Sequence, residues 1–315
     1  RDRPNTSPKL RLREWRLVQV VIISPIPARP KKVSGRPPRA RPTLASSAIP
    51  RVTRVPRVLS PSSRPSARPT ARAMTFLKAD DISTCLDSLL RLDYPKEKLE
   101  IIVVDDASTD GTREVLRRYR RSLPLRVVSS DERVGYTRAL ERLIREAVER
   151  APYPKRDAIV TLQGDFTEHP EDLVRLVKTL EGGADVVAGS LSEISGGTPL
   201  PVRVARWAAP KILGASLKSC PVSDPFCSFR IYRVIVLKKV LRALGGAPLM
   251  QMAGWAANVE LLDLAVHHAR RVEEVGLGLR YDIRTRRSRF RTLPTLRELG
   301  RIRGKVSWTP DRDVA

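Results

Sequence analysis

From residue 81 onward, apolar residues follow two alternating patterns along the chain. One is a helical stripe, with apolar positions at i, i+3, i+4 and i+7, and the other is a short continuous run rich in β-branched residues, typical of a strand buried on both faces. The stripes cover residues 82–90, 115–119, 139–148 and 170–183, and the runs cover 99–106, 125–130, 157–162 and 184–189. Strands that alternate with helices predict βαβ units, and hence an α/β fold with a mostly parallel sheet flanked by helices.

Residues 1–73 differ in composition from the rest of the chain. They hold 18 Lys and Arg against 2 acidic residues, a net charge of +16 out of +25 for the chain, and 13 of the 26 prolines. Such a segment has little amphipathic period and too little apolar surface to fold alone. We expect a disordered Arg/Pro-rich arm over 1–73.

The role of this arm stays open between several interpretations. Arg-rich arms bind nucleic acid or anionic membrane surfaces, because each neutralised phosphate releases a counterion. Nucleic acid is disfavoured, since no aromatic residue between Trp15 and Phe76 offers the stacking that single-strand binders use. The other interpretation is a non-native start, with Met74 near the true start of the protein.

Cysteine content and apolar runs indicate the compartment. The three cysteines are too few and too scattered for a disulfide framework or a zinc site: Cys85, Cys220 and Cys227. No run reaches the roughly 18 apolar residues of a membrane span. We expect a cytoplasmic protein, with peripheral contact at the inner face of the membrane left open.

The stretch 203–218 allows two interpretations. Trp207 and several leucines and isoleucines alternate there with Arg and Lys, as in a helix that lies on a membrane surface. A core-facing helix broken at Pro210 is the alternative.

Two predicted strands end in polar and acidic residues. Asp105 and Asp106 end the run 99–106, and Gln163 and Asp165 follow the run 157–162. Ligands of open α/β sheets bind beyond the carboxyl ends of the strands, which places both clusters at one edge. Carboxylates there suit Mg²⁺ or Mn²⁺, or the N–H and O–H groups of a nucleotide. The alternative is that these acids serve turns and a helix that begins at Thr167.

These residues carry a resemblance to a known family. CLDSLLRLDYPKEKLEIIVVDDASTDGT (85–112) resembles the first signature of family-2 glycosyltransferases. DERVGYTRALERLIREA (131–147) is similar to the family's next segment, and VTLQGDFTEHPEDLVRLV (160–177) stands where the family has its Asp-x-Asp metal motif. The segments 222–233 and 259–290 resemble the acceptor and closing segments of polyprenyl-phosphate sugar synthases, a group that includes dolichyl-phosphate mannose synthase.

The resemblance implies a GT-A fold, a nucleotide-sugar donor, a divalent metal and inversion at the anomeric carbon. It implies that Asp105 and Asp106 bind the base and ribose of the donor, that Gln163 and Asp165 also face the donor, and that Asp165 is the Mg²⁺ or Mn²⁺ ligand. Asp224 and Arg230 would be catalytic, Asp224 as the base for a hydroxyl acceptor or as a positioning group for a polyprenyl phosphate. The residues expected near phosphate are Arg284, Ser288 and Arg289.

The chain departs from the family pattern at several positions. Gln163 replaces the first acid of the metal motif, Cys227-Ser228 replaces a Ser-Gly step, and Arg286 stands in place of a glycine. The family's opening strand and Pro-x-x-Asn-Glu loop have no match in MTFLKADD (74–81). Either the run 18–23 is that strand, followed by a long insertion, or the first strand is missing and the donor site is incomplete.

The resulting expectation has three parts along the chain. Residues 1–73 form the arm, 74–295 a family-2 glycosyltransferase domain, and 296–315 a C-terminal tail. The expected function is an inverting transfer of a sugar from a nucleoside-diphosphate donor to a lipid-phosphate or hydroxyl acceptor. The alternative is an inactive transferase-like scaffold whose basic arm binds nucleic acid or an anionic membrane surface.

Overall fold

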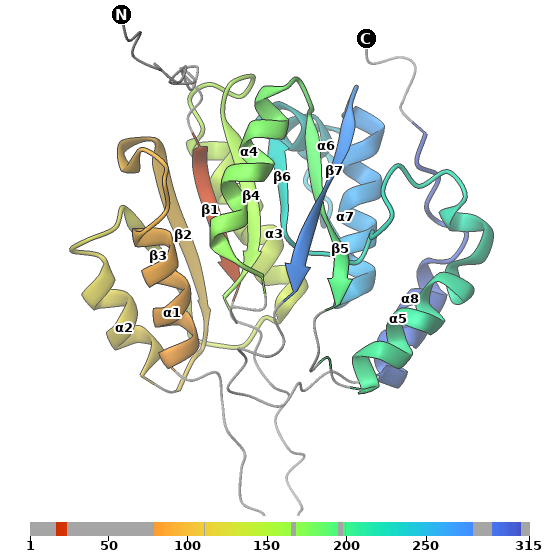
Figure 1. Cartoon of the computed structure of the whole chain (residues 1–315), viewed down its shortest axis with the longest axis horizontal. Coiled ribbons are helices and arrows are strands. Elements are labelled where there is room, and N and C mark those ends of the chain that lie inside the picture. Colours follow the sequence, from red (N-terminus) through yellow and green to blue (C-terminus); the bar gives the residue numbers. More distant parts are fainter. Residues whose placement is uncertain are drawn as a thin grey trace, which may run out of the picture. The chain divides into compact units, whose positions relative to one another are not determined.

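A seven-stranded sheet organises the part of the chain that the structure describes. The computed structural model describes residues 17–23, 79–109, 111–164, 168–194, 198, 200–279 and 292–309. The strand order is β3-β2-β1-β4-β6-β5-β7 (Figure 1). The strands are β1 (Leu17–Ile23), β2 (Leu99–Asp106), β3 (Leu125–Ser130), β4 (Ala158–Gln163), β5 (Val186–Ile194), β6 (Arg230–Arg233) and β7 (Val272–Leu279).

Helices follow most of these strands. They are α1 (Ala79–Leu90), α2 (Thr112–Tyr119), α3 (Tyr136–Arg150), α4 (Leu173–Glu181), α5 (Leu200–Leu213), α6 (Val234–Leu244), α7 (Trp255–His268) and α8 (Thr292–Ile302), with short 3₁₀ turns η1 (Lys96–Lys98), η2 (Pro170–Asp172) and η3 (Gly214–Leu217). The predicted α/β class with a mostly parallel sheet is confirmed.

The direction of the strands fixes where a ligand can bind. β1 pairs parallel with β2 and β4, β2 with β3, and β5 with β7, whereas β6 runs antiparallel to β4 and β5. The carboxyl ends of the parallel strands therefore meet at one edge, the lower edge in Figure 1, where β6 begins. We call this the carboxyl edge.

The central strand β1 corrects the expectation of a missing first strand. Val20 pairs with Ile101 of β2 and Val160 of β4, so the run lies between two parallel neighbours. A strand in that position receives main-chain hydrogen bonds on both sides, and a short β-branched run suffices to form it. The prediction of a disordered arm over all of 1–73 is thus wrong for Leu17–Ile23; residues 1–16 and 24–73 lie outside the described residues.

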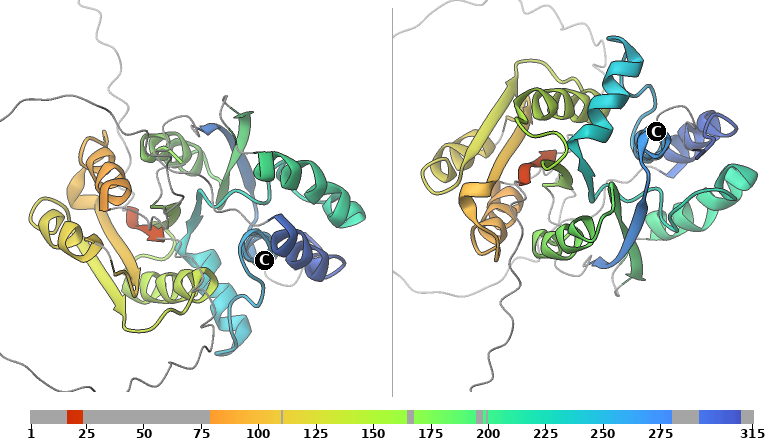
Figure 2. Two further views of the ribbon diagram at one scale, coloured as in Figure 1. Left: turned by 90° about the horizontal axis from the view of Figure 1, so that it is seen from below. Right: turned by 90° about the horizontal axis from the view of Figure 1, so that it is seen from above.

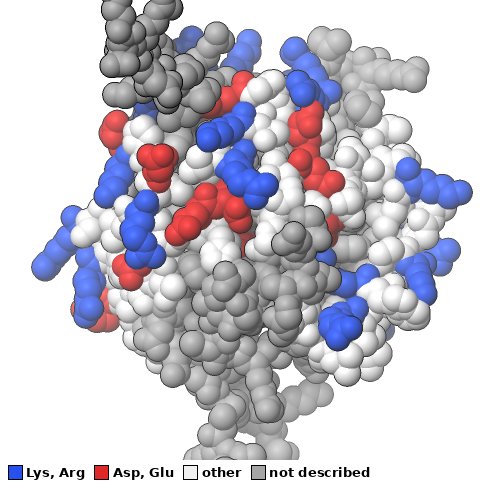
Figure 3. All heavy atoms as spheres, viewed as in Figure 1, with Lys and Arg blue, Asp and Glu red and all other residues white. Residues whose placement is uncertain are grey.

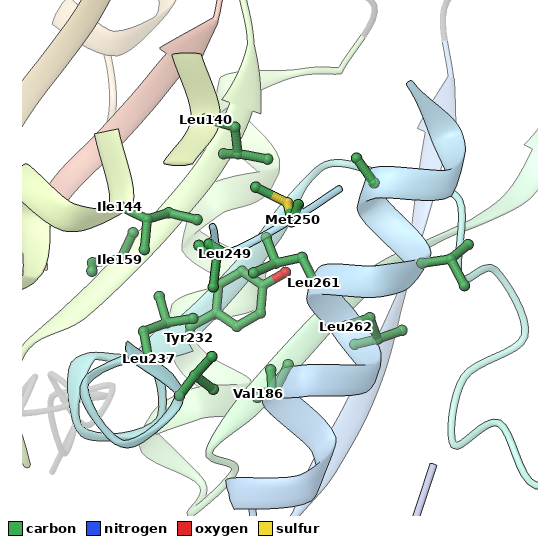
Figure 4. Packing of buried hydrophobic residues seen from close by; sticks show 14 of the residues in the cluster. Leu140, Ile144, Ile159, Val186, Tyr232, Leu237, Leu249, Met250, Leu261 and Leu262 are labelled. Atoms are coloured by element: carbon green, nitrogen blue, oxygen red, sulfur yellow. The ribbon is translucent and has the colours of Figure 1, made fainter. Parts of the chain in front are cut away.

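Two apolar layers cover the sheet, one on each face. Side chains of a strand alternate between faces: in β2, Ile101 and Val103 pack with α1, α2 and α4, whereas Ile102 and Val104 pack with α3, α6 and α7. Figure 2 shows the helices on the two sides of the sheet. Figure 4 shows the second layer, where Tyr232 of β6 lies among leucines of α6 and α7.

The end of the chain also belongs to this core. Leu299 and Ile302 of α8 and the following Trp308 are buried in the same layer as α7. The Asp263 carboxylate of α7 accepts hydrogen bonds from the N–H groups of Ser307 and Trp308. The expected boundary at residue 295 is therefore wrong, because α8 spans it and the folded unit extends to at least residue 309.

Candidate active site at the carboxyl edge

Three segments bring the candidate residues together at the carboxyl edge. β2 ends at Asp106, β4 ends at Gln163, and the segment that carries Asp224 leads into β6, which begins at Arg230. Thr161 of β4 pairs with Arg230 of β6, and the Thr161 hydroxyl donates to the carbonyl of Ser228 (2.5 Å). This pairing sets the 224–229 segment beside the end of β4.

Asp105 lies inside the protein, fully buried, with both carboxylate oxygens engaged. Oδ1 accepts from the N–H of Ser108 (3.0 Å), and Oδ2 accepts from Nε of Arg113 (2.6 Å). These bonds close the turn that begins at Ala107, whose φ of +55° lies in the left-handed region. Asp105 therefore shapes the loop beyond β2.

Asp106 holds the next loop in the same way. Its Oδ1 accepts from the N–H of Val134 (2.7 Å) and its Oδ2 from the N–H of Gly135 (3.0 Å), and the side chain is 4% exposed. Gly135 has φ +83°, a conformation that favours glycine, and directly precedes α3. The expected pair of acids is at the expected edge, and in this structure both carboxylates order the loops that form it.

Gln163 belongs to a buried polar network that the sequence did not reveal. Its Nε2 donates to Oγ of Ser228 (2.8 Å), and that hydroxyl donates to Oε1 of Glu168 (2.6 Å). Oε2 of Glu168 accepts from the main-chain N–H of Gln163 (3.2 Å). Cys227 lies next to this network, and burial, followed by the charges of Glu168 and Asp224, raises the pKa of its thiol well above the ordinary value. Cys227 is therefore held as a thiol.

Asp224 lies in an ion pair with a residue from another helix. Its Oδ2 is 3.0 Å from Nη1 of Arg206 in α5, and its Oδ1 accepts from the N–H of Phe226. The Arg206 guanidinium stacks over the ring of Trp255 at 5.5 Å. The N–H groups of Ser223 and Asp224 donate to Glu274 of β7. The Asp224 side chain is thus paired with a cation, and its main-chain N–H is bound to Glu274.

Arg230 is buried and donates hydrogen bonds to main-chain carbonyls. Only 1% of it is exposed, and its Nη1 and Nη2 donate to the carbonyls of Asn258 and Pro225, both at 2.6 Å. Asn258 in turn donates to the carbonyl of Phe226 (3.0 Å). The guanidinium binds the carbonyl of Pro225, next to Asp224 in the chain, and the catalytic role of Arg230 stays a prediction.

Four expected site residues lie outside the described residues. They are Asp165, Arg284, Ser288 and Arg289. Within the part of the chain that the structure describes, no three His, Cys, Asp or Glu side chains gather as a metal site.

Sequence reasoning missed three residues that shape this edge. Arg113, Arg206 and Glu168 each bind a predicted site residue or its partner. Arg113 lies one residue beyond the first quoted motif, and Glu168 lies inside the quoted segment 160–177. A signal existed for these two, whereas the Arg206–Asp224 pair depends on the packing of α5.

Comparison with known proteins decides the family. The model of Glycosyl transferase family 2 matches residues 74–241, more than half of the chain. This chain belongs to glycosyl transferase family 2. The predicted family is confirmed, and the observed mostly parallel sheet is the one that its GT-A fold implies.

Curated relatives within the family include polyprenyl-phosphate enzymes. The chain is 32% identical over 185 residues to a dodecaprenyl-phosphate galacturonate synthase of Rhizobium johnstonii, covering 56% of this chain and 51% of that protein. It is 27% identical over 166 residues to a dolichol-phosphate mannosyltransferase of Pyrococcus furiosus, covering 49% and 43%. The chain thus spans about half the length of these relatives.

Solved structures show weaker similarity. A mannosyltransferase from Pyrobaculum calidifontis, in complex with GDP-Man and Mn²⁺, is 24% identical with a TM-score of 0.43, covering 64% of this chain and 52% of that one.

Proposed function

We propose that this protein transfers a sugar, with inversion, from a nucleoside-diphosphate donor to a polyprenyl-phosphate acceptor. The observation that carries the proposal is the arrangement at the carboxyl edge. The ends of β2 and β4, expected to face the donor, lie at this one edge, and the segment of Asp224, expected to face the acceptor, lies beside the end of β4. Family membership and the polyprenyl-phosphate relatives support the same reaction class.

The chemistry of transfer sets what the site must supply. As the bond between the sugar and the diphosphate lengthens, negative charge grows on the leaving group and the sugar becomes oxocarbenium-like, so fixed cations and dipoles must face the diphosphate. Arg284, Ser288 and Arg289 are proposed for this role. They follow β7, whose carboxyl end lies at the same edge.

Asp224 is proposed to position the acceptor. A polyprenyl phosphate is already anionic and needs no base to attack the anomeric carbon. Asp224 forms an ion pair with Arg206, and Arg230 donates a hydrogen bond to the carbonyl of the next residue, Pro225. These two contacts are proposed to set the conformation of the acceptor segment. With a hydroxyl acceptor, Asp224 would instead be the general base.

Donor binding is proposed to use the loops that the two acids order. Asp105 and Asp106 hold the loops after β2 and before α3, and these ordered loops are proposed to bind the base and ribose of the donor. Gln163 adds an amide oxygen at the end of β4.

A divalent ion belongs to the proposal through Asp165. The described carboxylates at the edge are occupied by N–H groups and arginines, so these residues alone do not fit a metal. Mg²⁺ or Mn²⁺ would depend on Asp165 together with the donor phosphates, as hard cations in nucleotide sites take one or two carboxylates and phosphate oxygens. The reaction steps above are argued without it.

The acceptor also implies contact with a membrane surface. Leu200, Val204 and Trp207 lie on one face of α5 and are 68%, 44% and 67% exposed, and Leu293 of the adjacent α8 is 81% exposed. We call these four residues the α5–α8 apolar patch. The core-facing interpretation of this helix holds for its other face, which includes the buried Ala205, but not for the patch.

Basic side chains accompany the patch. Nζ of Lys211 lies 3.3 Å from the ring centroid of Trp207, and several Lys and Arg side chains lie among uncharged ones over this part of the surface in Figure 3. Apolar side chains beside basic ones suit the headgroup layer of an anionic membrane. No helix among the described residues is both long and apolar enough to span a bilayer. We propose peripheral binding at the inner, cytoplasmic face of the membrane.

A donor library tests the reaction. Hydrolysis of UDP-, GDP-, ADP-, CDP- and TDP-sugars is measured with Mg²⁺, with Mn²⁺ and with chelator. One sugar nucleotide should be cleaved in a metal-dependent way, and Asp165→Ala should reduce the rate by about 100-fold or more. Absence of cleavage of any donor by folded wild-type protein would argue against a transferase.

Vesicle binding tests the membrane contact. Cosedimentation with phosphatidylglycerol vesicles should fall about tenfold for the Trp207→Ser, Leu293→Ser double variant. Tyr153→Ser, which changes a 59% exposed aromatic residue outside the patch, should leave it unchanged. Equal binding of wild type and both variants to the vesicles would show that the α5–α8 apolar patch does not contact the membrane.

A further inference from the structure

Two positions at which the chain departs from the family pattern contact each other. Gln163 stands where the pattern has an acid, and Ser228 stands where it has a glycine. Nε2 of Gln163 lies 2.8 Å from Oγ of Ser228, and the pair comes from β4 and from the segment before β6, 65 residues apart. The two departures form one interaction, which a glycine at 228 cannot make.

Glu168 completes this interaction and fixes its direction. A carboxylate only accepts hydrogen bonds, so the Ser228 hydroxyl must donate to Oε1 of Glu168 (2.6 Å) and its oxygen must accept from Gln163. This requires the amide nitrogen, not the amide oxygen, of Gln163 to face Ser228. Among the described residues, the Gln163 amide oxygen has no hydrogen-bond partner and remains an acceptor.

The network also relocates a negative charge. Glu168 is 6% exposed, and both of its oxygens accept bonds from the network, one from Ser228 and one from the N–H of Gln163. A carboxylate at 163 would share this low-dielectric region with Glu168, separated by one hydroxyl, and like charges at such distances repel strongly. The neutral amide at 163 and the acid at 168 are therefore mutually dependent.

We propose that Glu168 and Ser228 are positioning residues that hold the Gln163 amide oxygen as an acceptor for the donor nucleotide, with Glu168 supplying the negative charge that position 163 lacks. This inference rests on the proposed function for the identity of the ligand. The dependence between the three side chains stands on their geometry. In this proposal, the acid that the family pattern has at position 163 is replaced by Gln163 together with Glu168, and the donor site is kept.

A double-variant cycle tests the proposal in the full chain. Binding of UDP and of GDP is measured by calorimetry, and thermal unfolding in parallel, for wild type, Gln163→Asp, Glu168→Gln and the double variant. Gln163→Asp should weaken binding of the nucleotide that wild type prefers by about tenfold and lower the melting temperature by about 3 °C. The double variant should return to within about threefold of the wild-type affinity and recover the melting temperature.

Serine variants supply the matched control. Ser228→Ala should weaken nucleotide binding by about fivefold, because the amide loses the group that orients it. Ser88 of α1 is also buried and donates to a different glutamate, Glu171. Ser88→Ala should leave nucleotide affinity unchanged.

The outcomes separate this inference from the proposed function. If the changes in affinity and in melting temperature for the double variant both equal the sums of the changes for the two single variants, the dependence between positions 163 and 168 is refuted. If the melting temperatures show that positions 163 and 168 depend on each other, but the variants bind nucleotide as tightly as wild type does, the positioning role is refuted. If wild type binds neither UDP nor GDP nor any other nucleotide of the donor library, the donor proposal fails, while recovery of the melting temperature would still support the charge exchange.

Discussion

Arg206 of α5 and Asp224 of the segment before β6 form an ion pair of 3.0 Å, with side chains that are 18% and 8% exposed. The pair joins the helix that carries Trp207 to the segment proposed to face the acceptor. Arg206 also stacks on Trp255. One guanidinium therefore connects the proposed membrane face with the proposed acceptor site.

Removal of Arg206 should destabilise the protein far more than loss of a surface pair. Arg206→Ala leaves Asp224 largely buried without its cation, and we expect a loss of about 3 kcal/mol in the free energy of unfolding, measured by urea denaturation. Arg301→Ala, which breaks an exposed pair with Glu298, should cost less than about 1 kcal/mol. Similar losses for both variants would contradict the account of the pair.

The loop before α3 should depend on the charge of Asp106. An amide at this position offers one acceptor oxygen for two main-chain N–H groups, those of Val134 and Gly135, and turns a donor toward the other. Asp106→Asn should therefore cost about 2 kcal/mol and weaken nucleotide binding. Asp93→Asn, at an exposed position, is the control, and equal stability of the two variants would show that Asp106 does not order this loop.

Tyr119 should make stability fall at high pH. Burial, helped by a hydrogen bond to Asp87, raises the pKa of Tyr119 to about 12 from its ordinary value of 10.0. The folded state therefore holds the phenolic proton more tightly than the unfolded state. Its stabilising effect is complete below pH 10 and is lost as the pH rises toward 12. The difference in melting temperature between wild type and Tyr119→Phe should shrink from pH 9 to pH 11.5; a constant difference would count against this linkage.

The central strand should be needed for folding. A chain that begins at Met74 lacks β1, and then β2 and β4 each lose a parallel neighbour. We expect this shortened chain to show no cooperative thermal transition by circular dichroism. A cooperative transition near the wild-type temperature would contradict the place of β1 in the sheet.

The fold was predictable where local pattern and tertiary position agree. Continuous β-branched runs such as Ile101–Val104 are buried on both faces, so they predicted parallel strands correctly. β1 was obscured because its neighbours in sequence are Arg and Pro, and its partners in the sheet are about 80 and 140 residues away. The antiparallel β6 has four residues and depends on β4 and β5 for its pairing.

The site was predictable in its location but not in its contacts. Strand-end acids marked the carboxyl edge, because parallel strands place their ends together. The roles of Arg230 and Glu168 could not be predicted, because burial of a charged side chain depends on which carbonyls and hydroxyls the fold brings to it. Gln163 removes a charge from the metal motif of the sequence, and only the structure places the acid Glu168 in contact with it.

Transfer of a sugar to a lipid phosphate tests the central claim most directly. Wild-type protein is incubated with radiolabelled nucleotide sugar and undecaprenyl phosphate in phosphatidylglycerol vesicles, and label in the organic phase is measured. We predict a lipid-linked sugar that wild type forms, that Asp165→Ala does not form, and that Asp224→Asn forms at least about 100-fold more slowly. Cleavage of the donor without label in the lipid, for undecaprenyl and dolichyl phosphate alike, would contradict the polyprenyl-phosphate acceptor.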